Sequence, residues 1–144
     1  QPVVLGDSIY LLAYNGNLLA VNLRSGQIKW KKEYSSYLNL SMSGFMLYLT
    51  DYMGHIYAVD SRDGSEVWKQ NSMTNRGLTG AYSHGDYVVV GDTQGYLHWL
   101  DKDNGEFVAR IELDDTGLYV EAIGKDNTIV VQTRDGEVSV ISVP

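Results

Sequence analysis

The sequence contains no cysteine, and this absence excludes several kinds of chemistry at once. Without a thiol the chain forms no disulfides, offers no thiolate nucleophile and binds no metal through sulfur. The absence does not identify a cellular compartment, because oxidising compartments permit disulfides without requiring them.

Basic residues are scarce, with 11 lysines and arginines against 18 aspartates and glutamates, which gives a formal net charge of −7. A nucleic-acid-binding surface needs many cations to neutralise phosphates, and binding to an anionic lipid surface needs a basic patch. We therefore expect no nucleic-acid partner and no direct contact with a membrane surface through charge.

Long apolar runs are also missing, since none approaches the about 20 residues that span a bilayer. No signal peptide is visible, and the chain begins without methionine in "QPVVLGD", a stretch typical of a strand. We expect a part of a longer protein, whose targeting information lies elsewhere.

Only two prolines occur, whereas glycine occurs 15 times and tyrosine 11 times, a composition typical of β-structure with many turns. One set of turn glycines is spaced by 38, 41 and 41 residues, and a second set by 38 and 41. The two sets are Gly16, Gly54, Gly95 and Gly136, and Gly26, Gly64 and Gly105. A period of about 40 residues with four short apolar runs per unit indicates a β-propeller.

The predicted fold is all-β, with about four blades of four antiparallel strands at 1–34, 35–71, 72–113 and 114–144. The first strands of the blades are expected at 3–5, 38–41, 79–83 and 119–123, and the last blade lacks its outer strand. Asn15-Gly16 and Asp135-Gly136 are typical of two-residue hairpin turns that require a positive φ.

Trp30 and Trp68 each follow the second turn glycine of their unit by four residues. We expect each tryptophan to pack on the neighbouring blade, with stacking on a ligand as the alternative. The third unit departs from this pattern, since Ala109 occupies the equivalent position and Trp99 lies on the preceding strand.

The shared pattern Ala20-x-Asn22-x-x-Ser25-Gly26-x-x-x-Trp30 resembles the tryptophan-docking repeat of pyrroloquinoline-quinone-type eight-bladed propellers. Within that superfamily, "LAYNGNLLAVNLRSGQIKWKKE" and "VVVGDTQGYLHWLDKDNGEFVAR" are similar to the BamB family, lipoproteins of the outer-membrane β-barrel assembly machinery. The resemblance extends along essentially the whole chain and implies the C-terminal half of an eight-bladed propeller.

The resemblance implies a non-enzymatic scaffold on the periplasmic side of the outer membrane of a Gram-negative bacterium. The implied partners are the periplasmic domains of the barrel-assembly protein, other assembly subunits and unfolded outer-membrane proteins. It also implies a membrane attachment only through an N-terminal lipid anchor that these residues do not include. The alternative is a fragment of a quinone-dependent dehydrogenase, whose relatives bind the quinone and calcium.

No cofactor, metal or catalytic residue is predicted. Asp101, Asp103, Asn104 and Gly105 imitate a calcium loop, but the glycine is one place early and strands rather than helices flank it. The three histidines, His55, His84 and His98, are expected on the surface or in grooves, without a histidine–carboxylate pair. No phosphate-binding or nucleophile-elbow motif is present.

Partner binding is instead expected on the longer links at 33–39, 70–80 and 112–121, because loops on a rigid frame suit recognition. The resemblance implies that blade-linking loops of the N-terminal half make the chief contact, so we expect at most a subsidiary contribution from these links. The residues chosen for it are Tyr34, Tyr37, Arg76 and Leu78, whose types are frequent at interfaces, although inward packing at the blade junctions is the alternative. Open edges at both ends of a half-propeller also predict that two copies associate and close a ring, with four blades that close alone or remain an open arc as the alternative.

Overall fold

The computed structural model describes residues 1–36 and 38–143, and these residues form β-strands without any helix. No described segment is therefore a helix that could cross a membrane. Tyr37, which was predicted to bind a partner, lies outside the described residues.

The strands form four antiparallel sheets, one after another along the chain. The first contains β1 (Val3–Leu5), β2 (Ser8–Leu12), β3 (Asn17–Asn22) and β4 (Ile28–Glu33). The second contains β5 (Ser41–Ser43), β6 (Met46–Thr50), β7 (Ile56–Asp60) and β8 (Glu66–Gln70). The third contains β9 (Tyr82–His84), β10 (Tyr87–Gly91), β11 (Tyr96–Asp101) and β12 (Phe107–Glu112). The fourth contains β13 (Ile123–Lys125), β14 (Thr128–Gln132) and β15 (Val138–Ser142).

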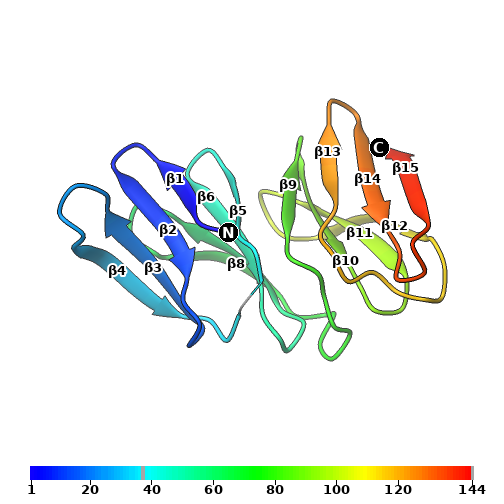
Figure 1. Cartoon of the computed structure of the whole chain (residues 1–144), viewed down its shortest axis with the longest axis horizontal. Helices are drawn as coiled ribbons and strands as arrows, with labels where there is room; N and C mark the ends of the chain where they lie inside the picture. The colour runs from blue at the N-terminus through cyan, green and yellow to red at the C-terminus, as the bar shows by residue number, and fades with distance from the viewer. Residues whose placement is uncertain (37, 144) are drawn as a thin grey trace.

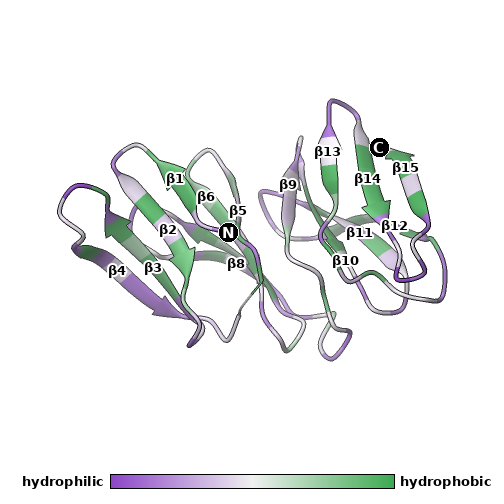
Figure 2. Cartoon of the chain, in the orientation of Figure 1, coloured by the Kyte–Doolittle hydropathy of each residue, from purple (hydrophilic) through white to green (hydrophobic). Residues whose placement is uncertain are grey.

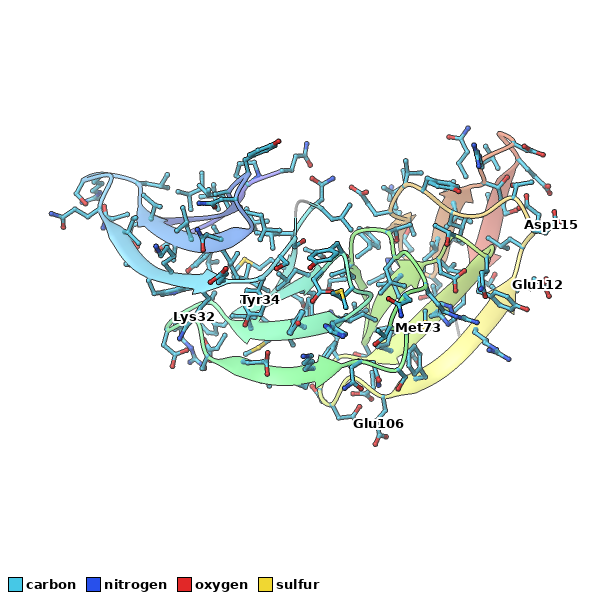
Figure 3. All side chains as sticks on the ribbon, turned by 90° about the horizontal axis from the view of Figure 1, so that it is seen from below. Lys32, Tyr34, Met73, Glu106, Glu112 and Asp115 are labelled. Atoms are coloured by element: carbon cyan, nitrogen blue, oxygen red, sulfur yellow. The ribbon has the colours of Figure 1, made fainter. Side chains whose placement is uncertain are left out.

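The sheets are the blades of a propeller fragment and follow one another around an arc, with the first and fourth at its two ends (Figure 1). Seen from below, the outer strands β4, β8 and β12 lie along the convex side of the arc (Figure 3). The expected all-β propeller fragment is confirmed, including a last blade of three strands. We keep the ranges 1–34, 35–71, 72–113 and 114–144 as the proposed blade boundaries.

The core lies between consecutive sheets, where three clusters of buried apolar side chains are found. Figure 2 shows hydrophobic residues mainly along the strands and hydrophilic residues in many of the turns. Leu18 and Leu47 are buried between the first two sheets, Ile56 and Leu100 between the second and third, and Ile129 belongs to the third cluster. Since each cluster joins two sheets, no blade buries its apolar surface alone.

The innermost strands of the last three blades begin three or four residues later than the sequence indicated. Before β9, the ladder stops at Tyr82 and resumes at an isolated bridge between Leu78 and Asp92, shifted by one residue. Before β13, Leu118 forms a similar isolated bridge with Thr133. These predicted strands are therefore interrupted by irregular backbone, which apolar alternation does not reveal.

Candidate functional site

Each outer-strand tryptophan of the first two blades packs on a glycine turn of the next blade. The Nε1–H of Trp30 donates to the carbonyl oxygen of Ser61 at 2.9 Å, and a Cβ placed on Gly64 would lie 2.8 Å from its Cε3. Trp68 repeats this contact with the carbonyl of Lys102 at 2.7 Å and with Gly105. These contacts are architectural and leave both indole rings engaged within the protein.

The third blade has a different tryptophan contact. Ala109 lies half-buried at the position equivalent to Trp30 and Trp68. Trp99 on β11 is only 3% exposed and belongs to the apolar cluster that the third and fourth blades share, where it lies with Ile129. The large ring of the third blade therefore packs from the neighbouring strand.

The acidic loop that imitates a calcium site is a turn closed by its own hydrogen bonds. The Oδ1 of Asp101 accepts from the backbone amide of Asp103 at 2.8 Å, and the amide of Gly105 donates to the Asp101 carbonyl at 2.9 Å. Asn22 and Gly26 form the same arrangement in the first blade. Within residues 1–36 and 38–143, no three acidic or histidine side chains gather as metal ligands.

One edge of the arc, here called the linker face, combines the turns between second and third strands with the links between blades. Two of its glycines lie against these links: a Cβ on Gly54 would approach the Met73 carbonyl oxygen to 2.3 Å, and one on Gly95 the Asp114 carbonyl oxygen to 1.5 Å. Gly16 has a looser contact with Ser35, at 3.2 Å from its Cα, and Gly136 meets only the Gln132 amide. Backbone hydrogen bonds from Tyr34 to the Gly16 carbonyl and from Leu113 to the Gly95 carbonyl, both at 2.9 Å, join the links to the turns.

The linker face presents exposed aromatic side chains. Tyr14 is fully exposed, Tyr52 is 63% exposed and Tyr119 is 53% exposed. Tyr14 and Tyr52 border one shallow depression, and the guanidinium of Arg134 lies 5.4 Å from the ring centre of Tyr119. Exposed tyrosine and arginine are typical anchors of protein interfaces.

Sequence reasoning did not select Tyr14 or Tyr52, because both stand in tight turns that the glycine pattern explains as architecture. The available signal was a tyrosine two residues before the turn glycine, in Tyr14-Asn15-Gly16 and in Tyr52-Met53-Gly54. A hairpin turn leaves such a side chain in solvent, where it has little to pack on.

The structure gives intramolecular contacts to the described residues that were predicted to bind a partner. Tyr34 packs edge-on against Tyr57 with 4.7 Å between ring centres, and burial raises the pKa of Tyr34 to about 12. Leu78 packs against the cluster between the second and third blades, and Arg76 forms an ion pair with Asp92 at 3.0 Å. Figure 3 shows Tyr34 where the chain passes from the first blade to the second. A role of these residues in partner binding stays a prediction.

Two buried aspartates organise the linker-face turns of the second and third blades. Asp92 has no exposed surface, and its Oδ1 accepts from the backbone amides of Gln94 and Tyr96 at 2.9 and 3.1 Å. Its Oδ2 accepts from Nε2 of His98 at 2.8 Å and from Arg76 at 3.0 Å. Burial lowers the pKa of His98, and the nearby carboxylate of Asp92 opposes this effect.

The second blade contains an equivalent buried aspartate, Asp51, but its histidine and tyrosine neighbours have exchanged positions in the sequence. Asp51 accepts from the Tyr57 hydroxyl at 2.8 Å and contacts Nδ1 of His55 at 3.0 Å. Histidine thus stands four residues after the aspartate in the second blade and six residues after it in the third. Both positions lie beside the same turn, so either residue reaches the carboxylate.

The predictions made for the histidines were wrong in two respects. His84 is buried, with an exposed fraction of 8%, whereas His98, although only 2% exposed, lines a pocket between the second and third blades, in agreement with a groove position. His55 and His98 both contact an aspartate, although no histidine–carboxylate pair was expected. The missed signal is an aspartate three residues before the turn glycine, as in Asp51 and Asp92. At this position the aspartate side chain lies next to the strand that follows the turn.

Ser72 lines the same pocket as His98, so a serine, a histidine and an aspartate lie in one region, as in a nucleophilic triad. The Ser72 hydroxyl, however, donates to Oε1 of Gln70 at 2.6 Å. The Nε2 atom of His98 forms its hydrogen bond with Oδ2 of Asp92. The described geometry therefore supports a structural role for this pair, which holds the turn and the link together.

The four successive antiparallel sheets and the tryptophan contacts between them define a β-propeller fragment of the tryptophan-docking type. The family model for "Outer membrane protein assembly factor BamB" matches residues 1–70 and 52–143, so the chain belongs to the BamB family.

Relatives with this name agree along nearly the whole chain. The protein from Aliivibrio fischeri is 49% identical over 138 residues, which are 96% of this chain and 36% of the relative. The protein from Shewanella oneidensis is 43% identical over 143 residues, which are 99% of this chain and 36% of the relative. The chain therefore spans about a third of the length of these relatives.

Solved structures show the same fold. BamB from Moraxella catarrhalis superposes with a TM-score of 0.88 at 26% identity, over 96% of this chain and 41% of that one. A quinohemoprotein alcohol dehydrogenase from Comamonas testosteroni reaches a TM-score of 0.76 at 17% identity, over 92% of this chain and 28% of that one. The likeness to the dehydrogenase shows only the shared propeller fold, so the dehydrogenase alternative has less support than membership of the BamB family.

Proposed function

We propose that the chain is part of a non-enzymatic scaffold that assembles β-barrel proteins in the outer membrane and docks onto the periplasmic domains of the barrel-assembly protein. Membership of a family of outer membrane protein assembly factors supports the assembly role. The location that follows is the periplasmic side of the outer membrane, with other assembly subunits and unfolded outer-membrane proteins as further partners.

The observation that carries the docking proposal is the set of exposed tyrosines on the linker face. Tyr14 and Tyr52 stand on turns that approach the following link, so they are presented on a rigid frame. A rigid aromatic side chain loses little conformational entropy on binding and provides a large apolar area. Tyr119 and Arg134 extend this surface to the fourth blade.

The test is capture of the full-length protein by the purified periplasmic domains of the barrel-assembly protein. Replacing Tyr14 and Tyr52 together by alanine should weaken binding at least fivefold, while the unfolding midpoint stays unchanged because both side chains are exposed. Phe45→Ala is the matched control, since Phe45 is 52% exposed in a turn at the opposite edge of the blades. Equal affinity of the double variant and the control would exclude this docking surface, and no capture of the wild type would exclude the partner.

The dehydrogenase alternative has its own measurement. Titration of the full-length protein with pyrroloquinoline quinone and calcium should leave the quinone absorbance spectrum unchanged if the chain belongs to a scaffold. A saturable spectral change with a defined stoichiometry would contradict the scaffold proposal and favour the quinone-binding alternative.

A further inference from the structure

A pocket of about 460 Å³ opens between the outer parts of the second and third blades. It is lined by Ser72, Met73, Arg76, His98, Phe107 and Arg110. Met73 is labelled in Figure 3 at this junction, on the link that follows β8. The volume falls in the range of about 300–1,000 Å³ that is typical of ligand sites.

The pocket exists because one position of the repeat holds a small residue. Tyr34 follows Trp30 by four residues and fills the equivalent junction between the first two blades by packing on Tyr57. Leu113 follows Ala109 by four residues and packs into the cluster between the third and fourth blades. At the same offset from Trp68 stands Ser72, whose small side chain leaves the space open.

The charge of the pocket is opposite to that of the chain. Arg76 and Arg110 place their guanidinium carbons 5.7 and 5.3 Å from the ring centre of Tyr96, so both cations meet at one aromatic side chain. Arg76 is paired with Asp92, whereas Arg110 has no ion pair among the residues that the structure describes. Two guanidinium groups thus face a single carboxylate, that of Asp92, so the group has an excess positive charge in a chain of net charge −7.

The remaining walls are apolar and suit a hydrocarbon body. Phe107 is 39% exposed and lies edge-on to His98 with 5.8 Å between ring centres. Met73 is buried beside it and offers an adaptable thioether side chain. A ligand with a carboxylate at one end and an apolar group at the other would match both halves of the pocket.

We propose that this pocket binds a carboxylate attached to an apolar, preferably aromatic, body, with Arg110 as its principal ionic partner. Arg76, held by Asp92, supplies a second guanidinium at a fixed position, and Phe107 and Met73 contact the apolar body. Arginine forms charge-assisted, often bidentate hydrogen bonds with a carboxylate, which gives such a site its selectivity for an acid over an amide.

The probe is 3-phenylpropionate, titrated into the full chain and followed by calorimetry or by amide chemical shifts. The acid should bind at least tenfold more tightly than its neutral amide, 3-phenylpropanamide, and more tightly than acetate, which lacks the apolar body. Arg110→Gln should weaken binding of the acid about tenfold. Ser72→Tyr should abolish binding, because it restores the filling residue of the first junction.

Arg24→Gln is the matched control, since Arg24 is exposed on a turn of the first blade, and it should leave the affinity unchanged. Thermal unfolding of every variant shows whether the fold is retained. Equal binding of acid and amide, or an affinity within twofold of wild type in both pocket variants, would overturn the proposal.

A free acid and an acidic side chain of another protein share this chemistry, and a second arm separates them. The blocked dipeptide acetyl-Phe-Glu-amide is compared with acetyl-Phe-Gln-amide on the same variants. Stronger binding of the acidic dipeptide than of 3-phenylpropionate identifies a protein side chain as the source, and the reverse order identifies a free acid. Binding of neither acid contradicts the site.

Discussion

Trp30 of the first blade packs so closely on Gly64 of the second that no side chain fits between them. A Cβ on Gly64 would lie 2.8 Å from Cε3 of the indole, and the backbone there has φ of +76°. Two features therefore favour glycine at position 64: the left-handed backbone conformation and the close packing of the Trp30 indole. Gly26 has nearly the same φ of +72°, but a Cβ added there would have no neighbouring atom within 4 Å. A substitution at Gly26 therefore tests the backbone conformation without the packing contact.

Gly64→Ala should cost more stability than Gly26→Ala. Both substitutions place a Cβ in the left-handed region, at about 1–2 kcal/mol, but only the first also overlaps the indole ring, at about 1–3 kcal/mol more. Urea unfolding of the two variants beside the wild type measures the difference. Equal losses in the two variants would show that the contact with Trp30 adds nothing to the turn requirement.

Trp68→Ala should lower the free energy of unfolding by about 3–5 kcal/mol, because a large buried ring is lost. The substitution also removes the hydrogen bond to the Lys102 carbonyl. Gly105→Ala should be less costly in the Trp68→Ala background than in the wild type, since a Cβ on Gly105 would lie 2.4 Å from the indole. A coupling of about 0.5–3 kcal/mol is typical of residues in contact, and strictly additive losses in the double variant would argue against direct packing.

The sequence located the turns because local chemistry determines them. The two-residue hairpins predicted at Asn15-Gly16 and Asp135-Gly136 are wrong in length: hydrogen bonds from the Ala13 amide to Asn17 and from the Thr133 amide to Glu137 close three-residue loops, with positive φ only at the glycine. The repeated glycines mark the turns as expected, since Gly16, Gly54, Gly95 and Gly136 all have positive φ. The innermost strands were misplaced because tertiary contacts decide where their pairing stops. The Thr50 hydroxyl of the second blade, for example, donates to the carbonyl of Thr79, before the third blade's first strand, at 2.8 Å. No local sequence pattern predicts this contact between neighbouring blades.

The candidate sites were harder to predict because they depend on exposure and on contacts between blades. Tyr14 is exposed, whereas Tyr34 packs against Tyr57. Residue type alone does not distinguish the two tyrosines. The pocket next to Arg110 follows from comparing Ser72 with Tyr34 at one repeat position, which the sequence contains. Recognising it required knowing that Tyr34 fills a junction, and only the packing shows this.

Stability should fall as the pH decreases through about 6.5, the ordinary pKa of histidine, because of His98. Burial lowers the folded-state pKa of His98, so the unfolded chain takes up a proton at a higher pH than the folded chain does. Asp92 opposes this shift, whereas Arg76 and Arg110 add to it.

The measurement is urea unfolding at several pH values from 8 to 5, for the wild type and for His98→Gln. The variant is expected to be less stable at pH 8, since the hydrogen bond to Asp92 changes, but to lose less stability between pH 7 and 5. Parallel curves for the two proteins over that interval would assign the pH dependence to other groups.

Two copies of the 144-residue chain should associate through the outward faces of the first and fourth blades, which stand at the two ends of the arc (Figure 1). Val4 and Ile28 are each 58% exposed on the first blade, and Val138 and Val140 are 60% and 68% exposed on the fourth. Apolar sheet faces of this kind favour burial against another sheet, and a two-fold pairing of two arcs places each first blade next to a fourth blade.

Light scattering over a range of concentrations should therefore detect a dimer of the 144-residue chain. Val140→Lys, which places a charge on the exposed face, should shift the equilibrium to monomer by at least tenfold, because an unpaired ammonium is costly to bury. Tyr14→Lys is the matched control, since it adds the same charge on the linker face away from the end sheets, and should leave the dimer intact. A monomer at all concentrations, or equal dissociation of both variants, would contradict pairing through the end faces.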